Sequence, residues 1–271
     1  MQITFIGGGN MAAALISGIV RQAGSGANIH VVDRNPEALE RLSQQYGART
    51  ATAIDEQVRD SEVVVLAIKP QQMRDVAAEL APHLTRQLVL SIAAGIASRD
   101  LSRWLGGYDA IVRTMPNTPA LIGMGVTGLA AQPGVSEAQR AQADTVMRAV
   151  GKTVWLDDEA QIDPVTAVSG SGPAYVFFFL EAMQEAALQM GLNAEQGREL
   201  ALATFTGAAQ LAAQSDEPVE VLRQRVTSKG GTTHAAITNM EAAGVKEAIV
   251  AAMKAAAARG RELGEELGKD A

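Results

Sequence analysis

The fold of this chain is decided by a stretch near its start, Ile3-Thr4-Phe5-Ile6-Gly7-Gly8-Gly9-Asn10-Met11-Ala12. Its first four residues form a short apolar run of the strand type, and a helical pattern follows the three glycines. The pattern G-x-G-x-x-A between a strand and a helix is typical of a dinucleotide-binding βαβ unit. In such a unit Gly7 permits the tight turn, Gly9 lets the backbone approach a pyrophosphate, and Ala12 permits close packing of the helix on the strand.

Two further features near the glycines concern a bound dinucleotide. The free N–H groups of Asn10 and Met11 lie at the positive end of the predicted helix, where they can bind an anion. Asp33 follows the second strand-like run, about 20 residues past the glycines, where a carboxylate accepts hydrogen bonds from a ribose diol. Arg34 and Asn35 can instead bind a 2′-phosphate and stack on adenine, so both NADH and NADPH stay open. A glycine-rich turn without a ligand and a plain helix cap at Asn35 are the structural alternatives.

Strand-like and helix-like segments alternate over residues 1–160. The strand-like runs are apolar at successive positions, as in strands that are covered on both faces. They are Ile3–Ile6, Ile29–Val32, Val63–Ile68, Leu88–Ile92 and Ile111–Arg113. Helical patterns between them include Met11–Arg21 and Pro36–Tyr46. This alternation predicts an α/β domain over residues 1–160, with a Rossmann-type, doubly wound parallel sheet.

Residues 161–271 differ in sequence pattern and composition, because strand-like runs disappear and alanine becomes abundant. Helical segments are expected at 172–190, 194–213, 218–226, 233–243 and 245–267. The second half is therefore predicted to be an all-α domain. Its many small residues leave only a few large ones, such as Phe177, Phe178 and Phe179, to fill space. A thin helical layer of this kind is expected to bury one face against a second copy of itself.

Composition excludes several classes of function. Thirty acidic residues against 23 basic ones give a formal net charge of -7, so a nucleic-acid partner is not expected. The chain has no cysteine and three scattered histidines, which predicts no disulfide and no metal site. The longest apolar runs, Val63–Ile68 and Val176–Leu180, are too short to cross a membrane. The start of the chain lacks a basic segment, which predicts no signal peptide and a cytoplasmic location.

Small and polar residues follow three of the later strand-like runs. They are Ala67, Lys69 and Pro70, then Ala93 and Ala94, and then Asn117. Ligands of open α/β sheets lie in the crevice beyond the carboxyl ends of the strands. The two small alanines would admit a flat nicotinamide ring, while Lys69 and Asn117 could contact ribose or carboxamide. Each segment taken alone is more often an ordinary strand-to-loop turn.

In the helical half the unusual segment is Val226-Thr227-Ser228-Lys229-Gly230-Gly231-Thr232-Thr233-His234-Ala235-Ala236. Hydroxyls and two glycines lead directly into a predicted helix. The N–H groups of Gly231, Thr232 and Thr233, together with the hydroxyls of Ser228 and Thr233, can therefore converge on a small carboxylate. The structural alternative is a polar loop with an ordinary threonine cap.

Taken together, these segments resemble the pyrroline-5-carboxylate reductase family, in the family's order and over essentially the whole chain. The resemblance is carried by 6–12, 68–70, Ser91-Ile92-Ala93-Ala94-Gly95, Met115-Pro116-Asn117-Thr118-Pro119, Val168-Ser169-Gly170-Ser171-Gly172-Pro173-Ala174-Tyr175 and 226–233. It implies reduction of 1-pyrroline-5-carboxylate to L-proline by NAD(P)H, and a homodimer or a larger ring of dimers. It further implies that the 228–233 loop holds the substrate carboxylate, while the nicotinamide lies along the rim from 67 to 117.

The inferred reaction assigns roles to the loop. Our hypothesis is that Thr233 hydrogen-bonds the ring nitrogen, while Ser228 and the N–H groups of Gly231 and Thr232 hold the carboxylate. A protonated cyclic imine accepts hydride readily, so no metal is expected. His234 is the alternative acid, although a residue one step past the helix start points elsewhere.

The chain departs from the family pattern at two positions. Most members have proline where this chain has Lys229, and they commonly carry asparagine near position 54, where this chain has Ile54. Loss of proline loosens the loop, while the added cation attracts an anionic substrate.

Two other functions stay open. One is that of a related imine reductase or β-hydroxyacid dehydrogenase acting on another small carboxylate, and the other is that of a protein that senses the cofactor without turnover.

Overall fold

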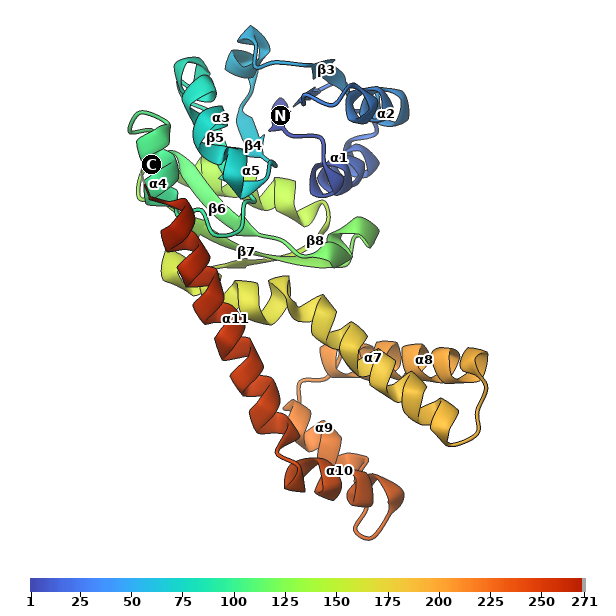
Figure 1. Ribbon diagram of the computed structural model, residues 1–271. Coiled ribbons are helices and arrows are strands. Elements are labelled where there is room, and N and C mark those ends of the chain that lie inside the picture. Colours follow the sequence, from blue (N-terminus) through green and yellow to red (C-terminus); the bar gives the residue numbers. More distant parts are fainter. Residues whose placement is uncertain (270–271) are drawn as a thin grey trace. The chain divides into compact units, whose positions relative to one another are not determined.

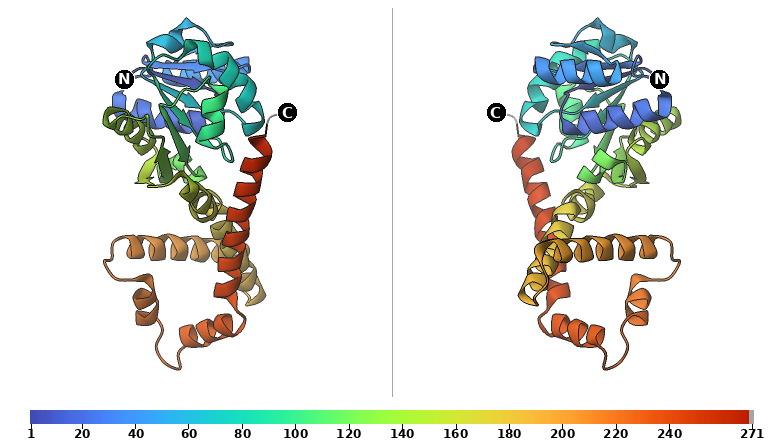
Figure 2. Two further views of the ribbon diagram at one scale, coloured as in Figure 1. Left: turned by 90° about the vertical axis from the view of Figure 1, so that its left-hand side faces the viewer. Right: turned by 90° about the vertical axis from the view of Figure 1, so that its right-hand side faces the viewer.

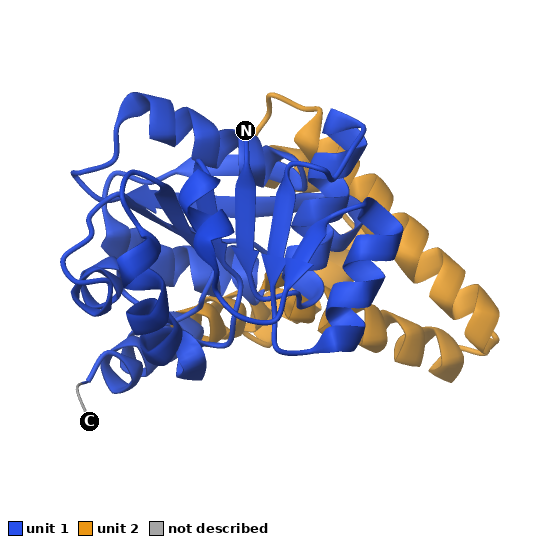
Figure 3. Ribbon diagram, turned by 90° about the horizontal axis from the view of Figure 1, so that it is seen from above, with its two compact units in different colours: residues 1–171, 255–271 blue, residues 172–254 orange. Residues whose placement is uncertain are grey.

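The computed structural model describes residues 1–269, which form two compact units. The first unit comprises residues 1–171 together with the segment from Ala255 onward, and the second comprises residues 172–254 (Figure 3). Among the described residues, every helix is too short or too polar to cross a membrane.

The first unit is built on a sheet of eight strands in the order β3-β2-β1-β4-β5-β6-β7-β8. The strands are β1 Ile3–Ile6, β2 Ile29–Val32, β3 Arg49–Ala51, β4 Val63–Leu66, β5 Leu88–Ser91, β6 Ile111–Met115, β7 Gly125–Ala131 and β8 Gly151–Trp155. The four-residue strands β1, β2, β4 and β5 are buried at every position, because helices cover both faces of the sheet.

Helices lie on both faces of the sheet (Figures 1 and 2), and two apolar clusters fill the space between the sheet and these helices. One cluster joins the sheet to α1 Asn10–Ala23, α2 Pro36–Tyr46 and α5 Glu137–Arg148. The other joins it to α3 Met73–Leu80 and α4 Ser98–Trp104. Short 3-10 turns occur at Glu56–Asp60, Pro70–Gln72, Ala81–His83, Thr118–Ile122 and Glu159–Gln161. Helix α6 Ile162–Val165 continues into a π-helical turn at Thr166–Gly170.

The second unit is helical. It contains α7 Gly172–Gln189, α8 Ala194–Ala213, α9 Val219–Arg225, α10 Thr232–Ala242 and the first part of α11 Val245–Leu267. Asn193 caps α8 with a capping box, and Gly191 with φ +95° ends the preceding turn. Phe179 of α7 contacts Phe205 of α8, with ring centroids 6.2 Å apart.

The predicted α/β fold with a helical second half is confirmed, and three strands were missed. All five predicted strands and both predicted helices of the first half are present, with ends shifted by a few residues at most. The missed strands are β3, β7 and β8. Strand β7 runs antiparallel to β6, so the sheet is mixed rather than wholly parallel. The other pairs are parallel.

The compact units are divided differently from the predicted domains 1–160 and 161–271. The first unit extends to Ser171, and it also includes the part of α11 from Ala255 to Leu267. The reason is local packing, since Leu267 joins the second apolar cluster and Arg103 donates to the carbonyl oxygen of Gly268 at 2.7 Å. The functional boundary at residue 160 stays a prediction.

Candidate functional site

The predicted cofactor residues lie at one edge of the sheet. Strands β1, β2, β4, β5 and β6 are parallel, so their carboxyl ends meet there, with Ile6 in register with both Val32 and Leu66. The residues that follow these strand ends are the ones that the sequence singled out: Gly7, Asp33, Ala67, Ala93 and Asn117. The first unit therefore has the rim that a dinucleotide needs.

The turn after β1 requires glycine at Gly7. Its φ is +105°, a conformation that residues with a Cβ rarely adopt. A Cβ at this position would also collide with the carbonyl oxygen of Ala67 at the end of β4. The Gly7 N–H donates to the Val32 carbonyl at 2.8 Å, which fixes the turn against β2.

Gly9 caps α1 without using a side chain. Its backbone is extended, no side chain caps the helix, and a Cβ there would meet no atom within 4 Å. The first-turn amides of Asn10 and Met11 have no partner inside the helix, which is the arrangement that binds a pyrophosphate. Ala12 is buried in the first apolar cluster, which fits its predicted role in packing α1 on the sheet.

Asp33 is held in place by backbone N–H groups. Its Oδ2 accepts from Gly8 N at 2.6 Å, and its Oδ1 accepts from Asn35 N at 2.8 Å. These bonds fix the carboxylate between the glycine turn and the start of α2. Each carboxylate oxygen keeps a second lone pair, so the group can still accept from a ribose hydroxyl.

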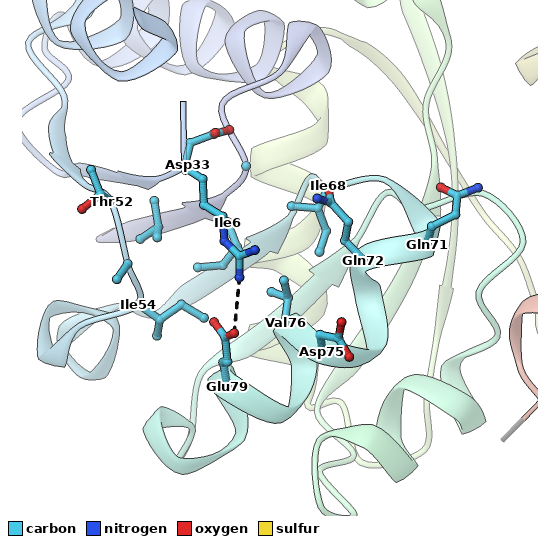
Figure 4. Close-up of a pocket in the computed structure, with 14 residues that line it drawn as sticks. Ile6, Asp33, Thr52, Ile54, Ile68, Gln71, Gln72, Asp75, Val76 and Glu79 are labelled. Carbon is cyan, nitrogen blue, oxygen red and sulfur yellow. Dashed lines mark hydrogen bonds and ion pairs between the residues drawn. The ribbon is translucent and has the colours of Figure 1, made fainter. Parts of the chain in front are cut away.

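A cavity of about 260 Å³ opens beside Asp33 (Figure 4). Ile54, Ile68 and Val76 give it apolar walls suited to a flat ring, and Arg34 reaches across it to Glu79. Ile54 is the position where asparagine was expected from the family pattern, and it supplies an apolar wall instead of an amide.

The side chains of two predicted cofactor-binding residues, Asn35 and Asn117, form hydrogen bonds within the protein. The Asn35 side-chain oxygen caps α2 by accepting from Glu37 N at 3.0 Å. The buried amide of Asn117 accepts from Val126 N at 3.0 Å and donates to the Ser169 carbonyl at 3.1 Å. Both side chains therefore have structural partners, and cofactor contacts by them stay predictions.

The remaining rim residues differ in exposure. Lys69 is exposed, and it precedes the 3-10 turn that Pro70 opens. Ala93 is buried while Ala94 is exposed. Only Gly7, Asp33 and Arg34 of the predicted cofactor set line the cavity.

The loop from 226 to 233 lies in the second unit, between α9 and α10. Gly230 has φ +76°, and Gly231 caps α10 with extended backbone and no side-chain cap. The amides of Thr232 and Thr233 are in the first turn of α10 and have no partner inside the helix. Within residues 1–269, the hydroxyls of Ser228, Thr232 and Thr233 make no hydrogen bond.

The prediction for the Gly231 N–H is wrong. The Gly231 N–H was predicted to be free, but it donates to the Ser228 carbonyl at 3.0 Å. The bond closes a tight turn around Gly230, which the loop needs in order to enter α10. His234 is exposed in the first turn of α10.

The sequence missed several residues of the cavity. Thr52, Gln71, Gln72, Asp75, Val76 and Glu79 line it. Thr52 follows β3, Gln71 and Gln72 lie in the 3-10 turn Pro70–Gln72, and the other three are on α3, so no single motif marks them. A signal was available in the predicted topology, because α3 follows β4 and β4 lies next to β1 in the sheet. No group of three or more potential metal ligands occurs within the described residues.

Comparisons with known proteins cover both halves of the chain. Residues 2–95 match the family described as NADP oxidoreductase coenzyme F420-dependent, and residues 159–263 match the family described as pyrroline-5-carboxylate reductase dimerisation. The helical half therefore contains a dimerisation domain.

Individual relatives match over nearly their full lengths. A pyrroline-5-carboxylate reductase of Pseudomonas aeruginosa is 48% identical over 270 residues, covering 99% of this chain and 98% of that protein. The solved structure of a Coxiella burnetii pyrroline-5-carboxylate reductase has a TM-score of 0.91 at 41% identity, covering 97% of this chain and 98% of that one. A Plasmodium falciparum pyrroline carboxylate reductase, solved with NADP bound, has a TM-score of 0.87 at 27% identity and covers the same shares. The chain belongs to the pyrroline-5-carboxylate reductase family.

Proposed function

We propose that the start of α10 holds the substrate of this enzyme. The chain is an NAD(P)H-dependent pyrroline-5-carboxylate reductase, which makes L-proline from 1-pyrroline-5-carboxylate in proline biosynthesis. The observation that carries the proposal is the combination at residues 228–233 of free helix-start amides and hydroxyls without partners. A carboxylate is the ligand that such a group of donors favours.

The proposed roles follow from what each group can donate. The Thr232 and Thr233 amides point along the axis at the positive end of α10, so they and the Ser228 hydroxyl would bind the substrate carboxylate. The Thr233 hydroxyl would hydrogen-bond the ring nitrogen and stabilise its proton. The Gly231 N–H would be a further donor only if its hydrogen bond to the Ser228 carbonyl opened, so we assign Gly231 the role of shaping the turn.

The cofactor roles are assigned to the first unit. The amides of Asn10 and Met11 would bind the pyrophosphate beside Gly7, Gly9 and Ala12, and Asp33 would accept from the adenosine ribose. When bound, NAD(P)H supplies the hydride for the imine carbon. Lys69, Pro70, Ala67, Ala93, Ala94 and Asn117 would line the nicotinamide end, with Arg34 and Asn35 at the adenosine end.

Assembly follows in part from the family. The dimerisation domain makes the enzyme a homodimer. We propose in addition that dimers associate into a larger ring, which sedimentation velocity would reveal as a species heavier than a dimer. A cytoplasmic location stays a prediction.

The first test concerns Thr233. Thr233→Ala removes a hydrogen bond that we place on the reacting ring, so kcat/KM should fall by about tenfold or more, since a bond to a charged group is worth about 1.5–3 kcal/mol. The measurement is steady-state NAD(P)H oxidation with 1-pyrroline-5-carboxylate. His234→Ala is the matched control, because it changes the neighbouring residue in the same helical turn.

The outcomes separate the proposed roles. Normal turnover by Thr233→Ala with impaired turnover by His234→Ala would transfer the proton role to the histidine. Oxidation of NAD(P)H with a 3-oxoacid or a larger cyclic imine, but not with 1-pyrroline-5-carboxylate, would contradict the proposed substrate.

A further inference from the structure

The adenosine end of the cofactor cavity carries an excess of negative charge. Three carboxylates line it, those of Asp33, Asp75 and Glu79, against the single guanidinium of Arg34. Asp75 and Glu79 lie four residues apart on α3, so both project from the same face of that helix toward the cavity (Figure 4).

Arg34 is the residue that would otherwise favour a phosphorylated ribose. An arginine just after the acidic residue at the end of β2 is where enzymes that use NADPH bind the 2′-phosphate. Here Arg34 Nη2 lies 3.4 Å from Glu79 Oε1, with the two side chains 76% and 54% exposed. An exposed pair of this kind is weak. Glu79 therefore acts less by holding Arg34 than by cancelling its charge at the point where a phosphate would bind.

Asp33 lines the same cavity, and its carboxylate is fixed in position. Backbone amides of Gly8 and Asn35 hold its two oxygens at 2.6 and 2.8 Å. A ribose with both hydroxyls free can donate to this fixed carboxylate, whereas a 2′-phosphate of charge about -1.5 to -2 offers no donor and is repelled.

From these observations we infer that this enzyme selects NADH over NADPH, and that Glu79, assisted by Asp75, is a specificity-determining residue. The inference rests on the proposed placement of the adenosine in this cavity. The physical reason is electrostatic repulsion. The cavity has two more negative than positive side chains, and a 2′-phosphate would bring further negative charge into it.

The test measures cofactor binding directly. Dissociation constants of NADH and NADPH for the full-length enzyme would be determined by isothermal titration calorimetry, without substrate, at about pH 7. The wild type should bind NADH at least about tenfold more tightly. Glu79→Gln removes one carboxylate and leaves the charge of Arg34 uncancelled, so it should tighten NADPH binding by about threefold or more and leave NADH binding nearly unchanged. The double variant Asp75→Asn, Glu79→Gln should extend the same trend.

Glu137→Gln is the matched control. It also removes an exposed glutamate that is paired with an arginine, Arg140, at 3.8 Å, but it lies on α5 and does not line the cavity. It should not change the ratio of the two dissociation constants. The wild-type preference should also shrink as salt is raised from about 0.05 to about 0.5 M, because the charges involved are exposed and screened.

Each outcome has a defined meaning. Equal or tighter binding of NADPH by the wild type overturns the inference, as does a Glu79→Gln ratio equal to that of the wild type or of the Glu137 control. If neither cofactor binds, the proposed placement of the dinucleotide in this cavity fails and the inference fails with it, whereas the substrate role of residues 228–233 is tested separately by Thr233→Ala.

Discussion

Gly7 and Gly9 stand two residues apart in one motif, yet the backbone makes different demands at the two positions. Gly7 has positive φ and touches the end of β4, while Gly9 has ordinary extended backbone and open space at its Cβ position. The motif therefore combines one glycine needed for folding with one that leaves room for a ligand.

Alanine substitutions should separate these two requirements. Gly7→Ala should lower the free energy of unfolding by about 2 kcal/mol or more, through backbone strain and the clash with Ala67. Gly9→Ala should cost less than about 1 kcal/mol, the loss of a moderate N-cap, while weakening cofactor binding strongly. Urea unfolding and calorimetric titration of the cofactor give the two readouts. A Gly9→Ala enzyme that binds cofactor normally would contradict the pyrophosphate placement.

Asn35 and Asn117 show why only part of the site could be predicted from the sequence. Asn35 and Asn117 are polar and lie just after strands, and Asn117 also belongs to the family pattern, so the sequence suggested ligand contacts for both. The structure instead gives them backbone partners in α2, at Val126 and at Ser169. The cap at Asn35 is the structural alternative that the sequence left open, whereas the fold brings Val126 and Ser169 to Asn117, so no local sequence pattern predicts those partners.

At the scale of elements, the pair β1–β2 contains a polar cluster within an apolar sheet. His30 is opposite Thr4 in the ladder and almost fully buried. Its Nδ1 lies 3.4 Å from Thr4 Oγ1, and its Nε2 lies 3.7 Å from Asp55 Oδ2. Burial lowers the pKa of His30 below 6.5, which the negative charge of Asp55 partly opposes and Arg49 reinforces.

This cluster predicts a pH dependence of stability. The folded state resists protonation of His30 while the unfolded chain accepts it, so the free energy of unfolding should be unaffected by this group above about pH 7 and should fall as the pH drops below about 6.5. His30→Asn cannot titrate, and it should flatten the profile between about pH 7 and 5. Urea unfolding across that range measures both proteins. Parallel profiles would show that His30 is not the group responsible.

Elements were predictable from sequence where they were apolar or capped. The buried strands β1 and β2 and the helices α2 and α8 have the predicted bounds, because apolar runs, Pro36 and Asn193 mark them. Strands β7 and β8 were missed for a physical reason. β7 contains two glycines, and residues of β8 are alternately exposed at the sheet edge, so neither has the continuous apolar pattern of a central strand.

At the scale of the whole molecule, the helical unit exposes an aromatic face on α7. In the single chain Phe177 and Phe178 are 60% and 72% exposed. Phe178 also borders an apolar cavity of about 490 Å³ within the second unit, with Tyr175, Phe179 and Val245. A dimerisation domain with such a face is expected to cover it with the second copy.

A charge at this face should weaken the dimer. Phe178→Asp is expected to shift the enzyme toward monomer, with a lower melting temperature that becomes dependent on protein concentration. Phe178→Leu keeps an apolar side chain, and it should retain most of the association. Sedimentation equilibrium of the two variants distinguishes a buried contact from an exposed one, since an unchanged dimer in Phe178→Asp would place this residue outside the interface.

The discontinuity of the first unit affects how the chain can fold during synthesis. Leu267 packs into the second apolar cluster, and Arg103 reaches the carbonyl oxygen of Gly268. The nucleotide-binding half therefore stays unfinished while the ribosome translates the intervening helices, and it is completed only when the last turns of α11 emerge. A nascent chain arrested before residue 255 should accordingly remain more susceptible to protease in its first 171 residues than the released protein.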